Sequence, residues 1–388
     1  MISIPSVVRG WLLRVRLPVS LLAAWAAFCV VLAGVLIWLL AGDAGPEDAP
    51  PAFLAAQAPM PPSAKPQPAA RTNEAAGAVG ETARAAVEPK PEPPAREAEP
   101  AEPARAAPQA APAQLAPQVA LAPAPDPALV EQSAFGPLPR IGADGREPWQ
   151  VYARPFDTSD PRPRVAIVIS GLGRSAAATE AAIQGLPGAV TLAFLPYGQN
   201  LQHLINLARA AGHEVLLNLP MEPIDYPIND PGPNTLLTAL SIEQNQNRLN
   251  WVLGRVTGYV GVTNHMGSRF TASQEAMEPV IDTLKSRGLL FLDSREASRS
   301  TGAILATKRE VPRAIVDRFV DRREASRAVI DAHLSEVERR AKEEGVALAM
   351  GQHYPVTIER LRAWIATLEE KGIALSPISA VVNLQEDR

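Results

Sequence analysis

The sequence lacks the features that usually mark a disulfide-rich, zinc-binding or nucleic-acid-binding protein. Its 388 residues include a single cysteine, Cys29, which lies inside an apolar run, so the rest of the chain can form no disulfide of its own. The five histidines include no short ligand motif such as His-x-x-x-His. The chain has a formal net charge of −4, and between residue 42 and about residue 160 lysine and arginine are scattered among acidic residues without a polybasic patch. We therefore expect no nucleic-acid partner.

One long apolar run stands near the N-terminus. Residues 19–41 form an uncharged stretch of 23 residues, long enough to cross a hydrocarbon core of about 30 Å as a helix. Three arginines precede it and three acidic residues follow it, so the positive-inside rule predicts that residues 1–18 are cytoplasmic. A cleaved signal peptide is the alternative, although its apolar region is usually only about 7–15 residues long. We expect a single-pass inner-membrane protein whose C-terminal domain is periplasmic.

A segment rich in proline, alanine and glutamate follows. Of the 39 prolines, 23 lie between Asp43 and Gln150, and aromatic and β-branched residues are few there. Such a composition buries too little apolar surface to offset the entropy of ordering the chain. The interpretation is a disordered linker over residues 42–160, followed by one globular domain over residues 161–388.

The globular part alternates apolar runs with amphipathic segments. Strands are predicted at residues 165–170, 190–196, 215–217, 259–265, 289–294, 314–320 and 346–353, and helices at 175–184, 200–211, 241–254, 272–287, 323–344 and 357–371. Seven or eight such repeats call for a parallel sheet, and a (β/α) barrel is the first prediction. A doubly wound open sheet is the alternative.

Polar residues follow the predicted strands at the ends where parallel α/β sheets place their ligands. They are Ser170, Gly171, Tyr197, Asn218, Glu222, Asn264, His265, Asp293, Arg295 and His353. Any one of them could simply cap the next helix, but their convergence from several strands predicts a site. His203, His213 and His333 fall away from these strand ends and are interpreted as structural or solvated.

Several motifs carry a resemblance to a known family. VAIVISGLG, VTLAFLPYG, GHEVLLNLPMEP, NHMGSRFT, LLFLDSR and GQHYPVTIERL resemble, in order and spacing, the divergent branch of the polysaccharide deacetylase (NodB-homology) superfamily. The resemblance covers about residues 164–382 and implies a distorted (β/α) barrel. It also implies metal-dependent removal of acetyl groups from sugars, in which a metal activates water and a carboxylate acts as general base.

The chain departs from this family where the metal would bind. The resemblance implies a pair of aspartates after the first strand, and this chain has Ser170 and Gly171 there. The two histidines implied after the third strand fall on Asn218 and Glu222. Of the three expected ligands only Glu222 can serve, because an amide is a poor zinc ligand and glycine has no side chain. Deacetylation is therefore expected to be impaired or absent.

Two catalytic alternatives remain open. The candidate catalytic residues are Glu222, His265, Asp293 and His353, and a rebuilt Zn²⁺ site would use Glu222, His265 and His353. Ser170 could instead act as a nucleophile, although it lacks the flanking glycines of GxSxG. The short GLG turn is too weak a signal for phosphate binding.

Two functional hypotheses follow. One is an enzyme acting on an envelope glycan or peptidoglycan, and the other is a non-catalytic glycan-binding protein; a scaffolding role for the linker is a third possibility. The expected binding residues are Tyr197, Asn218, Glu222, Asn264, His265 and Arg295.

Overall fold

The computed structural model describes Val119 and residues 121–386 of the chain. The predicted membrane span at residues 19–41, and the predicted linker up to residue 118, lie outside the described residues. Within the described part, no helix combines the length and the apolar character needed to cross a membrane.

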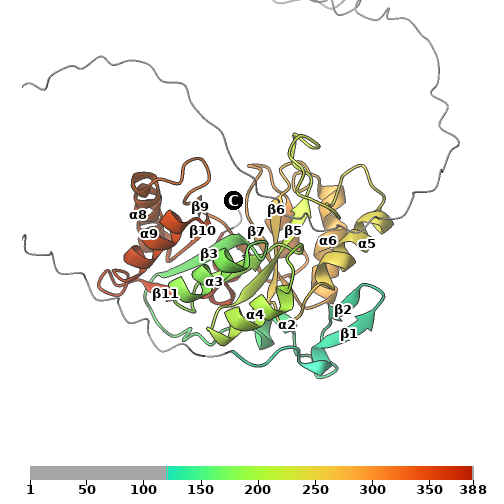
Figure 1. Ribbon diagram of the computed structural model, residues 1–388, viewed down its shortest axis with the longest axis horizontal. Coiled ribbons are helices and arrows are strands. Elements are labelled where there is room, and N and C mark those ends of the chain that lie inside the picture. Colours follow the sequence, from blue (N-terminus) through green and yellow to red (C-terminus); the bar gives the residue numbers. More distant parts are fainter. Residues whose placement is uncertain (1–118, 120, 387–388) are drawn as a thin grey trace, which may run out of the picture. The chain divides into compact units, whose positions relative to one another are not determined.

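A curled parallel sheet forms the centre of the domain (Figure 1). The strand order is β8-β7-β6-β5-β4-β3-β10-β9, and β11 pairs with β3 outside this path. The strands are β3 (Arg164–Leu172), β4 (Thr191–Phe194), β5 (Val215–Met221), β6 (Gly261–Met266), β7 (Leu290–Asp293), β8 (Arg313–Ile315), β9 (Arg318–Phe319), β10 (Val346–Gln352) and β11 (Ala374–Ser376). The predicted alternation is confirmed, except that the strand expected at residues 314–320 divides into β8 and β9.

Helices connect the strands and cover the outer face of the sheet (Figure 1). They are α3 (Ala176–Gly185), α4 (Leu201–Ala210), α5 (Ile242–Leu253), α6 (Gln274–Ser286), α7 (Gly302–Lys308), α8 (Arg327–Glu344) and α9 (Pro355–Ile365). Ser241 forms the predicted capping box with Gln244 at the start of α5, which satisfies backbone N–H groups that the helix itself leaves unpaired. The short helix α7 was not predicted, because it lies in what reads as a polar loop after β7.

One extended segment, residues 313–319, brings the two edges of the sheet together. Its first part pairs with β7 and its second part with β10. The junction is continuous, since Val316 N donates to Asp293 O and Asp317 N donates to Leu348 O, both at 2.9 Å. An open, doubly wound sheet would keep its edges apart. The curled sheet agrees with the predicted (β/α) barrel.

Two apolar clusters flank the strands. The inner cluster contains alternate residues of the strands, including Ala166, Val168, Leu216, Leu292, Leu348 and Met350. The outer cluster lies between the strands and the helices and contains the intervening residues, such as Ile167 and Leu217. This alternation is the period-two pattern of strands buried on both faces.

Residues 121–156, here called the N-terminal arm, fold against the barrel. The arm contains η2 (Pro127–Leu129), the hairpin of β1 (Val130–Ser133) and β2 (Gly136–Pro139), and α2 (Pro148–Val151). Leu129 and Tyr152 of the arm join the inner cluster. The predicted disorder over residues 42–160 is therefore wrong for residues 121–160. The arm has few apolar residues, but they cover a surface that the barrel has already formed.

Two buried charged residues hold the arm in place. Arg209 of α4 donates to the backbone oxygens of Ala122 and Tyr152 in the arm and of Gly258 before β6, at 2.7, 3.1 and 2.9 Å. Glu214, which is fully buried, accepts from Arg154 N at 2.7 Å and from Ser379 N at 3.1 Å. Burial raises the pKa of Glu214 and lowers that of Arg209 to about 10. The arm and the C-terminal segment are thus tied together at the amino-terminal side of the strands.

Candidate functional site

The carboxyl ends of β3, β5, β6, β7 and β10 form one rim, because these strands run parallel in one curled sheet. The rim carries the residues that the sequence singled out after each strand: Ser170 and Gly171, Asn218, Asn264 and His265, Asp293, and His353. These residues therefore lie at or near the same edge of the sheet. The side chains differ in whether their polar atoms already have hydrogen-bond partners.

Ser170 and Asn218 bond to each other at the centre of the rim. Asn218 Nδ2 donates to Ser170 Oγ at 2.8 Å, and both side chains are buried. Asn218 Oδ1 has no hydrogen-bond partner among the described residues. Neither has the hydroxyl of Thr263, which is the register partner of Asn218 on β6. A buried polar layer with spare hydrogen-bonding capacity therefore lies below the rim.

Gly171 has a conformation and surroundings that suit only glycine. Its φ is +82°, where an L side chain is strained. A Cβ atom there would lie 2.9 Å from Gln352 Oε1 and 3.6 Å from the His353 ring. Ser170 and Gln352 are register partners on β3 and β10, so Gln352 and His353 occupy the space beside Gly171. A carboxylate side chain at this position would be strained by the positive φ and would require the Gln352 side chain to move.

His265 is a neutral imidazole at the rim. Burial, reinforced by the positive charge of Arg174, lowers its pKa to about 4. Within the described residues its ring has no hydrogen-bond partner. The following Met266 and Gly267 both have positive φ, 56° and 93°, and Asn264 Nδ2 donates to Met266 O at 2.8 Å. A strained turn thus holds His265 with both ring nitrogens unused.

The Glu222 carboxylate stabilises the loops that contain Thr238 and Arg269. Its Oε2 accepts from the N and Oγ1 of Thr238, both at 2.7 Å, and its Oε1 lies 3.3 Å from Arg269 Nη1. Its backbone oxygen accepts from Arg269 N and Phe270 N. Because both carboxylate oxygens of Glu222 have partners, the hypothesis that Glu222 is a catalytic residue or a metal ligand is not supported.

Asp293 and Asn264 are also engaged in local structure. Asp293 Oδ1 accepts from Arg295 N at 2.8 Å, and its Oδ2 accepts from Ser300 Oγ and from Ala303 N at the start of α7. Asn264 Oδ1 accepts from Ser294 N at 2.9 Å. These contacts shape the loop after β7, so a catalytic role for Asp293 is not supported.

The rebuilt metal site is not assembled. Across Val119 and residues 121–386, no three histidine, cysteine, aspartate or glutamate side chains converge so that they could hold a metal ion. His353 stays beside β3, with its Nδ1 3.4 Å from Ser170 O, while both oxygens of Glu222 are used. The proposed set of Glu222, His265 and His353 was wrong as a ligand group, because each belongs to a different strand end and has separate neighbours.

Tyr197 anchors the proline-rich loop beside the rim. Its hydroxyl donates to Pro233 O at 2.6 Å, and its ring lies 6.2 Å from that of Trp251 in a tilted arrangement. Burial raises the pKa of Tyr197. The ring is only partly covered, so it keeps an aromatic surface at the edge of the site.

Arg295 lines a cavity of about 580 Å³ next to the rim, which also contains arginines that the sequence interpretation missed. Arg318, Arg322 and Arg323 come from β9 and the residues after it. The clustering of basic residues in RFVDRR was the signal that pointed to them, but it was assigned to a strand and the start of a helix.

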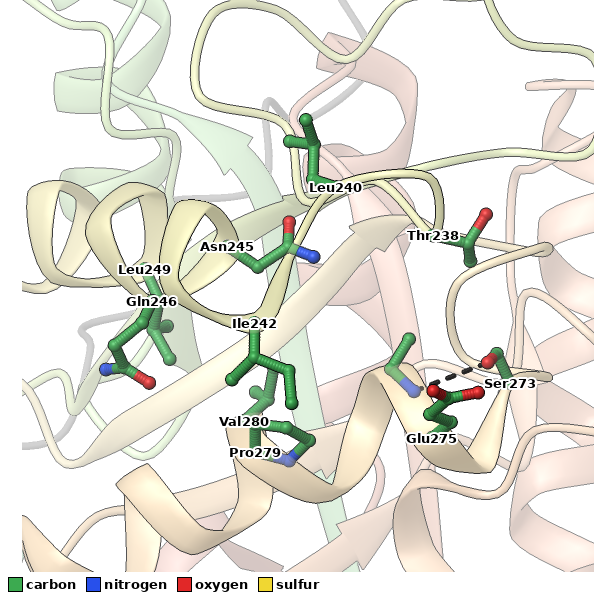
Figure 2. Close-up of a pocket in the computed structure, with 11 residues that line it drawn as sticks. Thr238, Leu240, Ile242, Asn245, Gln246, Leu249, Ser273, Glu275, Pro279 and Val280 are labelled. Carbon is green, nitrogen blue, oxygen red and sulfur yellow. Dashed lines mark hydrogen bonds between the residues drawn. The ribbon is translucent and has the colours of Figure 1, made fainter.

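A smaller cavity of about 100 Å³ lies elsewhere, between α5 and α6 (Figure 2). Its lining mixes the exposed Ile242 with amides and with Ser273, whose Oγ accepts from Ala276 N at 3.3 Å. It contains one charged side chain, Glu275, and none of the rim residues. The rim and its adjoining cavity are therefore the candidate site.

The curled parallel sheet and its covering helices define an α/β protein whose fold is consistent with a (β/α) barrel. Residues 167–382 match the family model for divergent polysaccharide deacetylases, and the chain belongs to that family. The predicted resemblance is thus confirmed.

Three relatives illustrate the similarity. The uncharacterized protein YibQ of Escherichia coli K12 is 33% identical over 132 residues, which are 34% of this chain and 40% of YibQ. An uncharacterized protein of Haemophilus influenzae is 29% identical over 208 residues, which are 53% of this chain and 72% of that protein. The crystal structure of an uncharacterized protein from Agrobacterium tumefaciens has a TM-score of 0.62 and 38% identity, covering 64% of this chain and 100% of that one. The match thus spans less than half the length of YibQ.

Proposed function

We propose that this protein is a periplasmic member of the divergent polysaccharide deacetylase family that binds an envelope glycan at the rim without metal-dependent deacetylation. The observation that carries the proposal is the bond between Asn218 Nδ2 and Ser170 Oγ. These two residues stand where the family resemblance implies a metal ligand and a base. Bonded to each other, they offer no carboxylate and no imidazole to a metal.

The remaining rim groups support recognition of a carbohydrate. His265 is neutral and unpartnered among residues 121–386, so one ring nitrogen can donate to a sugar hydroxyl or acetamido group and the other can accept from it. The partly exposed ring of Tyr197 adds an aromatic surface at the edge. Concave sites with a few convergent polar groups of this kind are the usual binding sites of α/β barrels.

The predicted N-terminal anchor is part of this proposal. A helix over residues 19–41 with the preceding arginines in the cytoplasm would leave the barrel on the periplasmic side, where envelope glycans are present. Reporter fusions placed after Gly42 test this topology. Activity of a periplasmic reporter supports it, whereas a mature chain beginning near Asp43 refutes the anchor.

Metal content and turnover test the absence of deacetylation. The purified full-length chain should contain far less than one Zn²⁺ per molecule and should release no acetate from chitin-type oligosaccharides. A stoichiometric metal, or turnover that a chelator abolishes, would contradict the proposal.

Glycan binding is tested at His265. In titrations with peptidoglycan fragments, His265→Ala should weaken binding about tenfold, the effect expected from losing roughly 1.4 kcal/mol of hydrogen bonding. The matched control is His203→Ala, because His203 is an exposed histidine on α4. Failure of the folded wild-type chain to bind any fragment refutes glycan binding.

A further inference from the structure

The cavity beside the rim is lined by five arginine side chains among its eleven residues. It lies among the carboxyl end of β7, residues 316–319 and α8, which can be followed in Figure 1. Its arginines are Arg295, Arg318, Arg322, Arg323 and Arg340, Asp317 is its acidic residue, and His333 also lines it. It borders the rim through Ser294, whose backbone N donates to Asn264 Oδ1.

Some of these charges already have partners. Arg318 pairs with Glu336, and Arg322 pairs with Glu296. Arg340 lies 3.4 Å from Asp317 and 3.1 Å from Glu344. The side chains of the Arg318–Glu336 pair are 42% and 43% exposed, and an ion pair this exposed typically contributes only about 0–1 kcal/mol. Exchanging Glu336 for an anionic ligand would therefore cost little.

Arg322 and Arg323 form the part of the cavity best suited to an anion. Arg323 has no acidic partner among the described residues. Burial is the larger cause that lowers the pKa of Arg322, and the positive charge of Arg323 is the smaller one. The Arg322 guanidinium lies over the Phe319 ring, 4.8 Å from its centroid. Stacking holds the planar guanidinium in one orientation, and such a group binds phosphate or carboxylate through two parallel hydrogen bonds.

A second observation comes from Ser294. Ser294 is one of the residues that line the cavity, and its buried hydroxyl has no hydrogen-bond partner within the described residues. A buried hydroxyl without a partner costs free energy that a ligand or a water can recover.

We infer that this cavity binds an anionic group, a phosphate or a carboxylate, carried by the glycan that the rim binds. The inference rests on the proposed function for the sugar part of the ligand. The arginine cluster supplies the charge recognition, and the adjoining rim supplies contacts to neutral hydroxyl groups.

The test uses the full-length chain and four probes: orthophosphate, a hexose phosphate, a uronic acid and the neutral hexose. Titrations at low salt should show that the two acidic sugars bind at least about tenfold tighter than the neutral hexose. Arg322→Gln and Arg323→Gln should each remove most of this difference. Arg339→Gln is the matched control, because Arg339 lies on α8, is 64% exposed and pairs with Glu343 outside the cavity.

The outcomes separate this inference from the proposed function. If acidic and neutral sugars bind alike, or if Arg322→Gln and Arg323→Gln bind like the wild type, the anion site is refuted while glycan binding stands. If both acidic sugars bind in an arginine-dependent way but peptidoglycan fragments do not bind, the anion site stands and the proposed function fails. Comparison of the two acidic sugars identifies the preferred anion. If orthophosphate binds as tightly as the hexose phosphate, the inference that the anion is carried by a glycan is refuted.

Discussion

Replacing Glu214 by alanine should detach the N-terminal arm from the barrel. The Glu214 carboxylate is fully buried and accepts hydrogen bonds from Arg154 in the arm and from the N and Oγ of Ser379 near the C-terminus. Glu214→Ala leaves those donors unpaired and removes an electrostatic contribution that raises the pKa of the buried Arg209. The loss of a buried charged acceptor with several donors should cost about 3 kcal/mol of unfolding free energy.

For a domain of this size, that loss corresponds to a decrease of roughly 6–12 °C in melting temperature. Thermal unfolding followed by circular dichroism measures the decrease, and limited proteolysis should show earlier cleavage between residues 121 and 156. The control is Glu180→Ala, since Glu180 is exposed on α3 and its loss should change stability by less than about 0.5 kcal/mol. A melting temperature within about 2 °C of the wild type, with an arm that still resists protease, would refute the reasoning.

Three further predictions concern the rim. Gly171→Ala should destabilise the protein by about 1–3 kcal/mol in urea unfolding, because φ is +82° and the new methyl group meets Gln352. An unchanged urea midpoint would contradict both the backbone strain and the contact with Gln352. Ser170→Ala should cost about 1–3 kcal/mol, because it removes the one side-chain hydrogen bond that buried Asn218 forms among the described residues, whereas a neutral result would point to a water in its place. The folded pKa of His265 is depressed to about 4, so its contribution to stability is present above an unfolded pKa of about 6.5 and is lost as the pH falls toward 4. His265→Gln should therefore flatten the dependence of unfolding free energy on pH in this window. Parallel pH dependences for the variant and the wild type would contradict the burial of a neutral ring.

Much of the barrel was predictable because its signals are local. The apolar runs of β3 and β10 alternate with amphipathic helices, and Ser241 with Gln244 marks the start of α5 three residues apart in the sequence. Such patterns depend on neighbouring residues only. The strand ends, and hence the position of the rim, follow directly from them.

The roles of the rim side chains depend on contacts that are distant in the sequence. Glu222 is fixed by Thr238 and Arg269, and Asp293 by the start of a helix that has no strong sequence signal. The folded arm was missed for the same reason, since its few apolar residues are buried only where the barrel covers them. No pattern within the arm indicates that surface.

The segment at residues 313–319 has a consequence for how this protein behaves at high protein concentration. A bare outer strand exposes backbone groups that another chain can pair with, which is a common start of aggregation and domain swapping. Here the last strand on each side of the sheet belongs to one continuous stretch, bonded to β7 through Val316 and to β10 through Asp317. Within the described sheet, these few residues protect both edges from intermolecular β-pairing. The substitution Val316→Pro removes the backbone N–H that donates to Asp293 O, so it should promote oligomers as well as lower stability.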